Sequence, residues 1–396
     1  MQTVNGVPFG GCTAMGDGIA SAASLLGGAP SPRAIVLFSD GYDNRGCAPP
    51  GSTRPTALQA AQALPADVRL FSCAMGPASD QALLESIANA RSGRYYFMPA
   101  IDELFEVYNY IRGQVSGSSI VVNQQGQASS SSVPAFIDAA ARVATFTVAW
   151  ADAGLRAVPG DPRKPHEVGI RLVDPRGTPV PAHASFVRRH VADTFVVFRV
   201  EDPAPGRWHL QVQTMEQTHV TYTAGVFVDS PLGLVIGMYP RRVKVGEVVG
   251  IGAVMLDGST PFLPGRASAT ISAPRVGLRE EIRRWRDALK EIEPPKMSGD
   301  TLPTDVARLT VLSQRLKKGE LFSRVATTNR LSRDRFPWNK ALPRRSSIIV
   351  HPNAPTLAGS FQVAQAGSYN VTVNVSGITP SGLRFVRTDR LSIVAR

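Results

Sequence analysis

Cysteine and long apolar runs are both scarce in this sequence. The 396 residues contain three cysteines, Cys12, Cys47 and Cys73, which are too few for a disulfide framework and lack the Cys-x-x-Cys spacing of a zinc site. No apolar run reaches the roughly 18 residues that a membrane-spanning helix needs, so we expect no membrane span. Met1 is followed by polar and glycine-rich residues rather than by a signal peptide. The redox compartment stays open on these grounds.

Catalytic motifs are missing as well. The chain has no Gly-x-Ser-x-Gly nucleophile elbow, no phosphate-binding P-loop and no Gly-x-Gly-x-x-Gly turn that opens a helix. Its six histidines are scattered without the spacing of metal ligands. The sequence therefore predicts a protein that is not an enzyme.

Basic residues are abundant but unevenly distributed. A formal charge of +12 would indicate a nucleic acid or another acidic partner if it covered one face of the protein. Residues 1–117, however, carry seven Lys and Arg against nine Asp and Glu, whereas residues 275–345 carry eighteen against nine. Because most of the excess belongs to one segment, we expect no nucleic acid partner. Nucleic acid binding through that segment is the least favoured alternative.

That basic segment shows helical periodicity. Five apolar residues recur at steps of four and three and would lie on one helical stripe: Leu278, Ile282, Trp285, Leu289 and Ile292. Residues 306–316 suggest a second helix after a Pro-Pro break. The basic residues of this pair are either a solvated face around a small core or a docking surface for an acidic partner.

Residues 1–117 alternate short apolar runs with helical patterns, which is typical of a parallel α/β sheet. Ser79 is expected to cap the helix that follows it. Cys73 falls within a strand and is expected in the core. We expect strands at 33–38, 68–75 and 95–98, and helices at 56–64, 79–90 and 102–115.

From residue 118 onward alternating strands and turn residues predict all-β structure. We expect one β-sandwich over 118–224, in which residues 118–132 form a strand and a polar linker. A second sandwich over 225–396 begins with a strand at 225–236 and carries the basic helical insertion at about 275–345. Trp150 and Trp208 look like core anchors of the first sandwich.

Two short motifs carry the chemistry that the sequence offers. GGCTAMGDG at 10–18 places Thr13 before a helix, and SDGYDN at 39–44 places Asp40 at the carboxyl end of a buried strand. Open α/β sheets bind ligands at this edge, and a hydroxyl with a carboxylate suits Mg²⁺ or Ca²⁺. Each residue also has a structural alternative to metal binding. Thr13 could be a helix N-cap, and Asp40 could be a capping or turn residue.

These motifs resemble the second and third parts of the metal-ion-dependent adhesion site of von Willebrand factor A domains. The resemblance implies that Thr13 and Asp40 are metal ligands, directly or through water, and that residues 1–117 form part of a doubly wound A-domain sheet. The segments TFTVAW, IRLVDPRG, PAPGRWHLQV and GSYNVTVNVSG resemble the region after the A domain in calcium-activated chloride channel regulators and their bacterial relatives. The implied fold is a partial α/β A domain followed by two Ig-like β-sandwiches.

One departure from that family pattern is large. The family's metal site opens with Asp-x-Ser-x-Ser, which this chain lacks; the string that begins at Asp257 ends in proline and is better explained by a turn. A sheet without the strand that carries this motif would leave a hydrophobic edge beside residues 33–38. We therefore expect a fragment or truncated product, and very weak Mg²⁺ or Ca²⁺ binding by this chain alone.

The resemblance also implies a function. The leading hypothesis is a secreted, periplasmic or surface-attached adhesion protein, whose complete A domain binds an acidic side chain of a protein partner through a divalent ion. The alternative is a non-catalytic region of a larger secreted metalloprotease-like protein of the chloride channel regulator type. A cytoplasmic ATPase or chelatase adaptor is disfavoured because such systems seldom append tandem sandwiches.

Cys12 and Cys47 are either an oxidised pair or two thiols.

Overall fold

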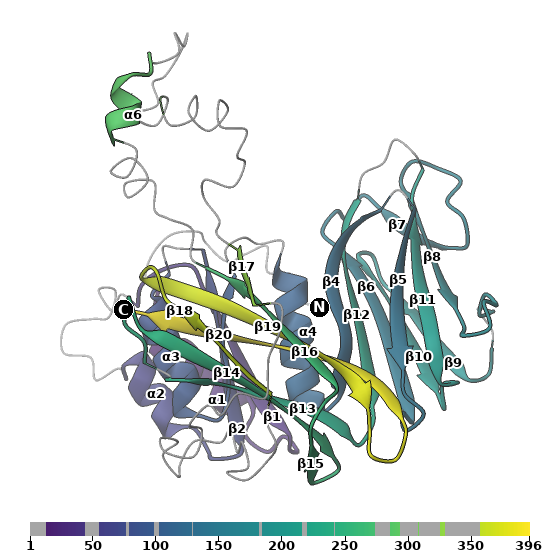
Figure 1. Ribbon diagram of the computed structural model, residues 1–396, viewed down its shortest axis with the longest axis horizontal. Coiled ribbons are helices and arrows are strands. Elements are labelled where there is room, and N and C mark those ends of the chain that lie inside the picture. The colour runs from purple at the N-terminus through teal and green to yellow at the C-terminus, as the bar shows by residue number, and fades with distance from the viewer. Residues whose placement is uncertain are drawn as a thin grey trace.

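The computed structural model describes residues 13–43, 55–76, 79–98, 103–128, 130–181, 184–215, 220–240, 242–273, 286–293, 308, 325–328 and 357–396. Within them the chain forms a small α/β unit and two β-sandwiches, and strand is the main secondary structure (Figure 1). The fold is therefore α/β plus a larger β-rich part. The Ig-like character of the sandwiches stays a prediction.

The α/β unit is built on three parallel strands in the order β1-β2-β3. Parallel strands are buried on both faces, which explains why these strands appear in the sequence as mainly apolar runs. All three begin where the sequence predicts. The elements are β1 (Arg33–Ser39), β2 (Val68–Met75), β3 (Tyr95–Met98), α1 (Met15–Leu25), α2 (Ala57–Ala63), α3 (Gln81–Ala90) and α4 (Leu104–Ser116).

The helices cover the two faces of this sheet unequally. Helices α1, α2 and α3 share one core with Leu70 of β2, whereas α4 packs on the other face against Phe71.

Helix α3 is capped by Asp80, whose carboxylate accepts a hydrogen bond from the Leu83 backbone N–H at 3.0 Å. The predicted cap, Ser79, is therefore wrong, since it lies one residue too early to reach the first turn.

Strand β1 forms one edge of the described sheet. It pairs with β2 and, within the described residues, with no other strand. Phe38 on β1 is 37% exposed, although an aromatic side chain in a parallel sheet is normally covered. The expected hydrophobic edge is thus present among the described strands.

The first sandwich encloses a single hydrophobic core between a five-stranded and a four-stranded sheet. Trp150 and Trp208 are both almost fully buried in it, so their predicted role as core anchors is confirmed. The first sheet is β4 (Ser119–Ala128), β12 (Val220–Asp229), β6 (Val143–Trp150), β10 (Phe195–Glu201) and β9 (Val187–Val191); the second is β5 (Ser130–Ile137), β11 (Gly206–Gln213), β8 (Glu167–Val173) and β7 (Arg156–Pro159).

The second sandwich has its own core between two further sheets. In the first sheet β14 pairs with three strands, and in the second the order is β17-β16-β19-β20. The first sheet is β13 (Leu232–Tyr239), β14 (Val248–Asp257), β15 (Thr260–Phe262) and β18 (Leu357–Gln362); the second is β16 (Arg266–Ser272), β17 (Val325–Thr328), β19 (Gly367–Ile378) and β20 (Arg384–Ala395).

Two expectations about the β-rich part are wrong. The predicted polar linker within 118–132 is strand almost throughout, because β4 pairs with β12 and the serines of β5 pair with β11. The predicted strand at 225–236 is divided by a turn at Ser230 and Pro231, so β12 belongs to the first sandwich and β13 to the second. Residues 225–229, expected in the second sandwich, thus lie in the first.

The basic insertion lies mostly outside the described residues. Its described helix is α6 (Arg286–Lys290). Two residues of the expected stripe are buried, Leu289 in this helix and Ile292 just after it. The other three stripe residues and most of the expected second helix fall outside the described part of the chain. The choice between a solvated face and a docking surface stays open.

Strand β20 joins the α/β unit to the second sandwich (Figure 1). The Arg94 guanidinium, at the start of β3, lies 2.7 Å from the Asp389 carboxylate of β20. Arg390 of β20 lies 2.8 Å from the Glu103 carboxylate and 3.2 Å from that of Glu106, both at the start of α4. These ion pairs are largely withdrawn from solvent, so they fix the orientation of the α/β unit.

Candidate metal site at the carboxyl ends of the strands

The loop after β1 (residues 40–43, the β1 loop) lies at the carboxyl end of the parallel sheet. The Gly41 backbone N–H donates to the Ser39 hydroxyl oxygen at 3.4 Å, and the Gly41 carbonyl accepts from the Asp80 backbone N–H at 3.2 Å. Helix α3 therefore helps to hold the loop that carries Asp40. Asp40 itself is exposed.

Thr13 lies in the segment before α1, beside the β1 loop. A Cβ atom placed on Gly41 would lie 3.7 Å from the Thr13 hydroxyl oxygen, so this hydroxyl faces the loop at van der Waals distance. A Cβ atom on Gly16 would lie 2.3 Å from the Pro55 carbonyl oxygen, so only glycine lets α1 approach the start of α2 this closely. The structure thus brings Thr13 beside the loop that contains Asp40.

Asp43 has a structural role in the same loop. Its Oδ1 accepts a hydrogen bond from the Met15 backbone N–H at 3.2 Å, while the residue at the N-cap position of α1 offers no side-chain acceptor. Asp43 therefore supplies the acceptor that the first turn of α1 needs. Thr13 is not the N-cap of α1, so this alternative for Thr13 is wrong.

The donor set fits a hard divalent cation that keeps most of its water. Thr13 and Asp40 offer one hydroxyl and one carboxylate, oxygen donors that suit Mg²⁺ or Ca²⁺. No three His, Cys, Asp or Glu side chains in the described part of the chain lie together as a metal cluster. Mg²⁺ is often bound through one or two carboxylates with several waters retained, whereas Ca²⁺ takes six to eight oxygen ligands. The residues present therefore fit weakly bound Mg²⁺ better than Ca²⁺.

The cysteines contribute nothing to this site in the described residues. Cys73 lies fully buried in β2, which confirms its predicted place in the core. Burial raises the pKa of its thiol to about 12, so it stays protonated at neutral pH. Cys12 and Cys47, expected as a pair or as thiols, lie outside the described residues.

No protein-family model and no curated protein sequence matches this chain. Solved structures similar to it include a DUF4785 family protein from Legionella pneumophila, with a TM-score of 0.37 and 7% identity over 69% of this chain and 64% of that one. The propeptide form of lipase BlEst2 from Bacillus licheniformis is similar with a TM-score of 0.31 and 11% identity, over 86% of this chain and 61% of the lipase.

The similar structures also include a von Willebrand factor type A protein. It comes from Catenulispora acidiphila and has a TM-score of 0.23 and 16% identity over 63% of this chain and 45% of that one. The chain spans less than two thirds of the length of each of these three structures. TM-scores this low assign neither a family nor a function.

Proposed function

We propose that this chain is a non-enzymatic, divalent-cation-dependent protein-binding or adhesion protein of the cell surface or secreted space. In this proposal its α/β unit is part of a von Willebrand factor A domain. The proposal rests on one observation: the Thr13 hydroxyl lies beside the loop that contains Asp40, at the carboxyl end of β1. Ligands of open α/β sheets bind at this edge.

The two residues have distinct roles in the proposed site. Thr13 presents a neutral oxygen and Asp40 a charged one, and the exposure of Asp40 leaves its carboxylate open to solvent. A bound Mg²⁺ would supply positive charge and an open coordination position for a carboxylate of the protein partner. Because the chain lacks an Asp-x-Ser-x-Ser stretch, we expect weak affinity for the cation.

The sandwiches support the α/β unit in this proposal. The ion pairs of Asp389 and Arg390 hold β20 against β3 and α4, so the site is presented from a fixed platform. No helix among the described residues is long and apolar enough to cross a membrane.

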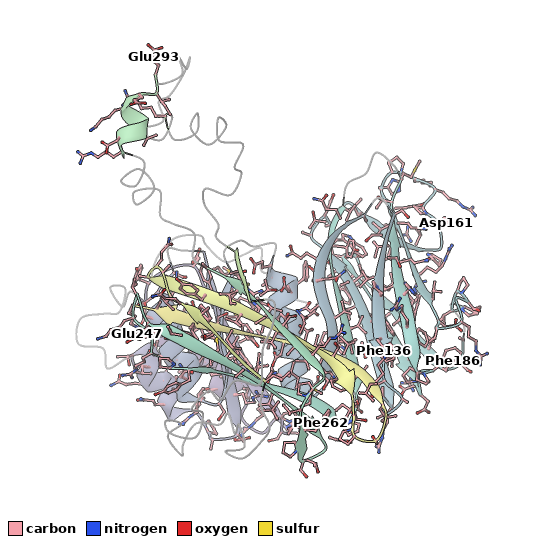
Figure 2. The ribbon with its side chains drawn as sticks, viewed as in Figure 1. Phe136, Asp161, Phe186, Glu247, Phe262 and Glu293 are labelled. Atoms are coloured by element: carbon pink, nitrogen blue, oxygen red, sulfur yellow. The ribbon has the colours of Figure 1, made fainter. Side chains whose placement is uncertain are left out.

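The test measures whether the chain and a cation together bind a carboxylate. The probe is the peptide acetyl-Gly-Glu-Gly-amide, and the readout is broadening of its glutamate methylene proton signals when Mn²⁺ and the chain are both present. We expect broadening beyond that caused by free Mn²⁺, its loss with EDTA and its loss in Asp40→Ala. Equal broadening in Asp40→Ala and in the wild type would refute the proposal. Asp161→Asn is the control variant, because Asp161 is an exposed carboxylate of the first sandwich (Figure 2).

A further inference from the structure

Strand β9 is the last strand of the five-stranded sheet in the first sandwich. Two hydrogen bonds beyond its ends fix which of its backbone groups face β10. The Glu201 N–H donates to the Phe186 carbonyl at 3.0 Å, and the Ala192 N–H donates to the Phe195 carbonyl at 2.9 Å. In an antiparallel pair, residues alternate between those that bond the partner strand and those that face away. The even-numbered residues of β9 therefore bond β10.

The odd-numbered residues of β9 direct their backbone groups to the open edge. The Val187 N–H is taken by the Ala184 carbonyl at 3.0 Å. The N–H and C=O of Arg189 and Val191 have no backbone partner in the described part of the chain. An open edge of this kind can accept an added strand.

The Arg189 side chain has unsatisfied donors at this edge, within the part of the chain that the structure describes. Its guanidinium lies over the Phe198 ring, 5.6 Å from the ring centroid, and its Nε and Nη2 are buried without a hydrogen-bond partner. Partial burial lowers the pKa of Arg189, and no carboxylate among the described residues opposes this effect. Two enclosed N–H groups without an acceptor are costly, so a carboxylate placed here would satisfy both of them and pair with the charge.

The surroundings of Arg189 are basic and apolar. Arg188 and His190 are exposed on the opposite face of β9. Three large apolar side chains near the strand ends are exposed: Phe186 at 46%, Val191 at 45% and Phe195 at 37%. Figure 2 places Phe186 at the outer margin of the first sandwich. The edge thus combines positive charge with uncovered apolar surface.

We propose that β9 docks an extended acidic segment of a partner protein as an added strand, with a carboxylate of that segment opposite Arg189. The added backbone would pair with the free N–H and C=O groups of Arg189 and Val191, and apolar side chains two residues away would lie beside Val187 and cover Val191. This surface is separate from the candidate metal site and does not need a cation.

A second copy of the chain is a poorer occupant of this edge. Antiparallel pairing of two β9 strands about Arg189 would place Arg189 opposite Arg189 of the second copy. Like charges directly opposite each other in a sheet are destabilising. The charge of β9 therefore favours an acidic partner over self-association.

The probe is a fluorescein-labelled peptide, Val-Asp-Glu-Asp-Val. Its sequence is palindromic, so the order of its side chains along β9 is the same in either strand direction. Its central glutamate would face Arg189 and its valines would cover the strand ends. We expect a saturable rise in fluorescence anisotropy that is unaffected by EDTA and by Asp40→Ala. The neutral peptide Val-Asn-Gln-Asn-Val should bind at least tenfold more weakly.

Two variants separate strand addition from simple charge attraction. Arg189→Gln removes the guanidinium, and we expect at least a tenfold loss of affinity. Val191→Pro removes an outward N–H while leaving the bonds to β10 intact, and proline is tolerated at such edge positions. We expect it to abolish binding. Arg207→Gln, an exposed arginine of β11, is the matched control and should bind like the wild type.

Thermal unfolding of each variant provides the folding control. Arg189→Gln should unfold no earlier than the wild type, because it removes an uncompensated charge. Failure of the acidic peptide to bind, equal binding by Arg189→Gln, or equal binding by Val191→Pro would overturn the proposal. Dimerisation of the chain that is lost in Val191→Pro would also overturn it, since a second copy would then occupy the edge.

Discussion

The Arg387 guanidinium lies 2.7 Å from the Asp138 carboxylate, and neither side chain has any exposed surface. Arg387 belongs to β20 of the second sandwich, and Asp138 follows β5 of the first. The same guanidinium donates to the Leu232 carbonyl at 2.9 Å and to the Ser230 hydroxyl at 3.1 Å. Burial lowers the pKa of Arg387, whereas the charge and hydrogen bond of Asp138 raise it. This fully buried pair joins the two sandwiches.

Arg387→Met is expected to destabilise the chain strongly. It leaves the Asp138 carboxylate buried without its cation, which costs about 3–5 kcal/mol in comparable pairs. The free energy of unfolding from urea titration measures the loss. The double variant Asp138→Leu with Arg387→Met should be more stable than Arg387→Met alone, because no unpaired charge remains. Equal stabilities of the single and double variants would contradict this account of the junction.

The stability of the chain is expected to fall in alkaline solution. Burial raises the pKa of Cys73 to about 12 and also raises the pKa of Tyr95, Tyr96 and Tyr110 above its ordinary value. The folded state therefore keeps protons that the unfolded state loses above roughly pH 9. The free energy of unfolding should decrease as pH rises from there towards 12.

Two measurements check the alkaline behaviour. Urea titrations at several pH values give the free energy of unfolding, and absorbance at 295 nm reports tyrosine ionisation. We expect the buried tyrosines to ionise together with the loss of structure. Ionisation of all eight tyrosines near pH 10, with the circular dichroism of the folded state unchanged, would show that these side chains are not buried as described.

The parallel strands were predictable from sequence because burial on both faces makes them short apolar runs. In the segment RAIVLF at 33–38, every residue after Arg33 is apolar, and β1 forms there. The serines at the start of β5 carry no such signal. Ser130 and Ser132 are not buried and their strand state depends on pairing with β11, so composition alone indicates a linker.

The candidate site was partly predictable and the other charged features were not. Thr13 and Asp40 stand beside Gly-rich turns and a buried strand end, which are local signals. The pairing of Arg387 with Asp138 has no local signal, because the partners are 249 residues apart. For β9, three consecutive basic residues between valines suggest an edge strand. The partial burial of Arg189 has no such local signal, because it depends on Phe198 of the next strand.

The most direct test of the candidate site is Mn²⁺ binding by the chain alone, followed by the electron paramagnetic resonance signal of free Mn²⁺. Mn²⁺ accepts the same oxygen donors as Mg²⁺. We predict binding in the millimolar range that is lost in both Thr13→Ala and Asp40→Ala and kept in Asp161→Asn. Binding that persists unchanged in both site variants, or micromolar binding by the wild type, would contradict the assignment of Thr13 and Asp40 as a weak, two-residue cation site.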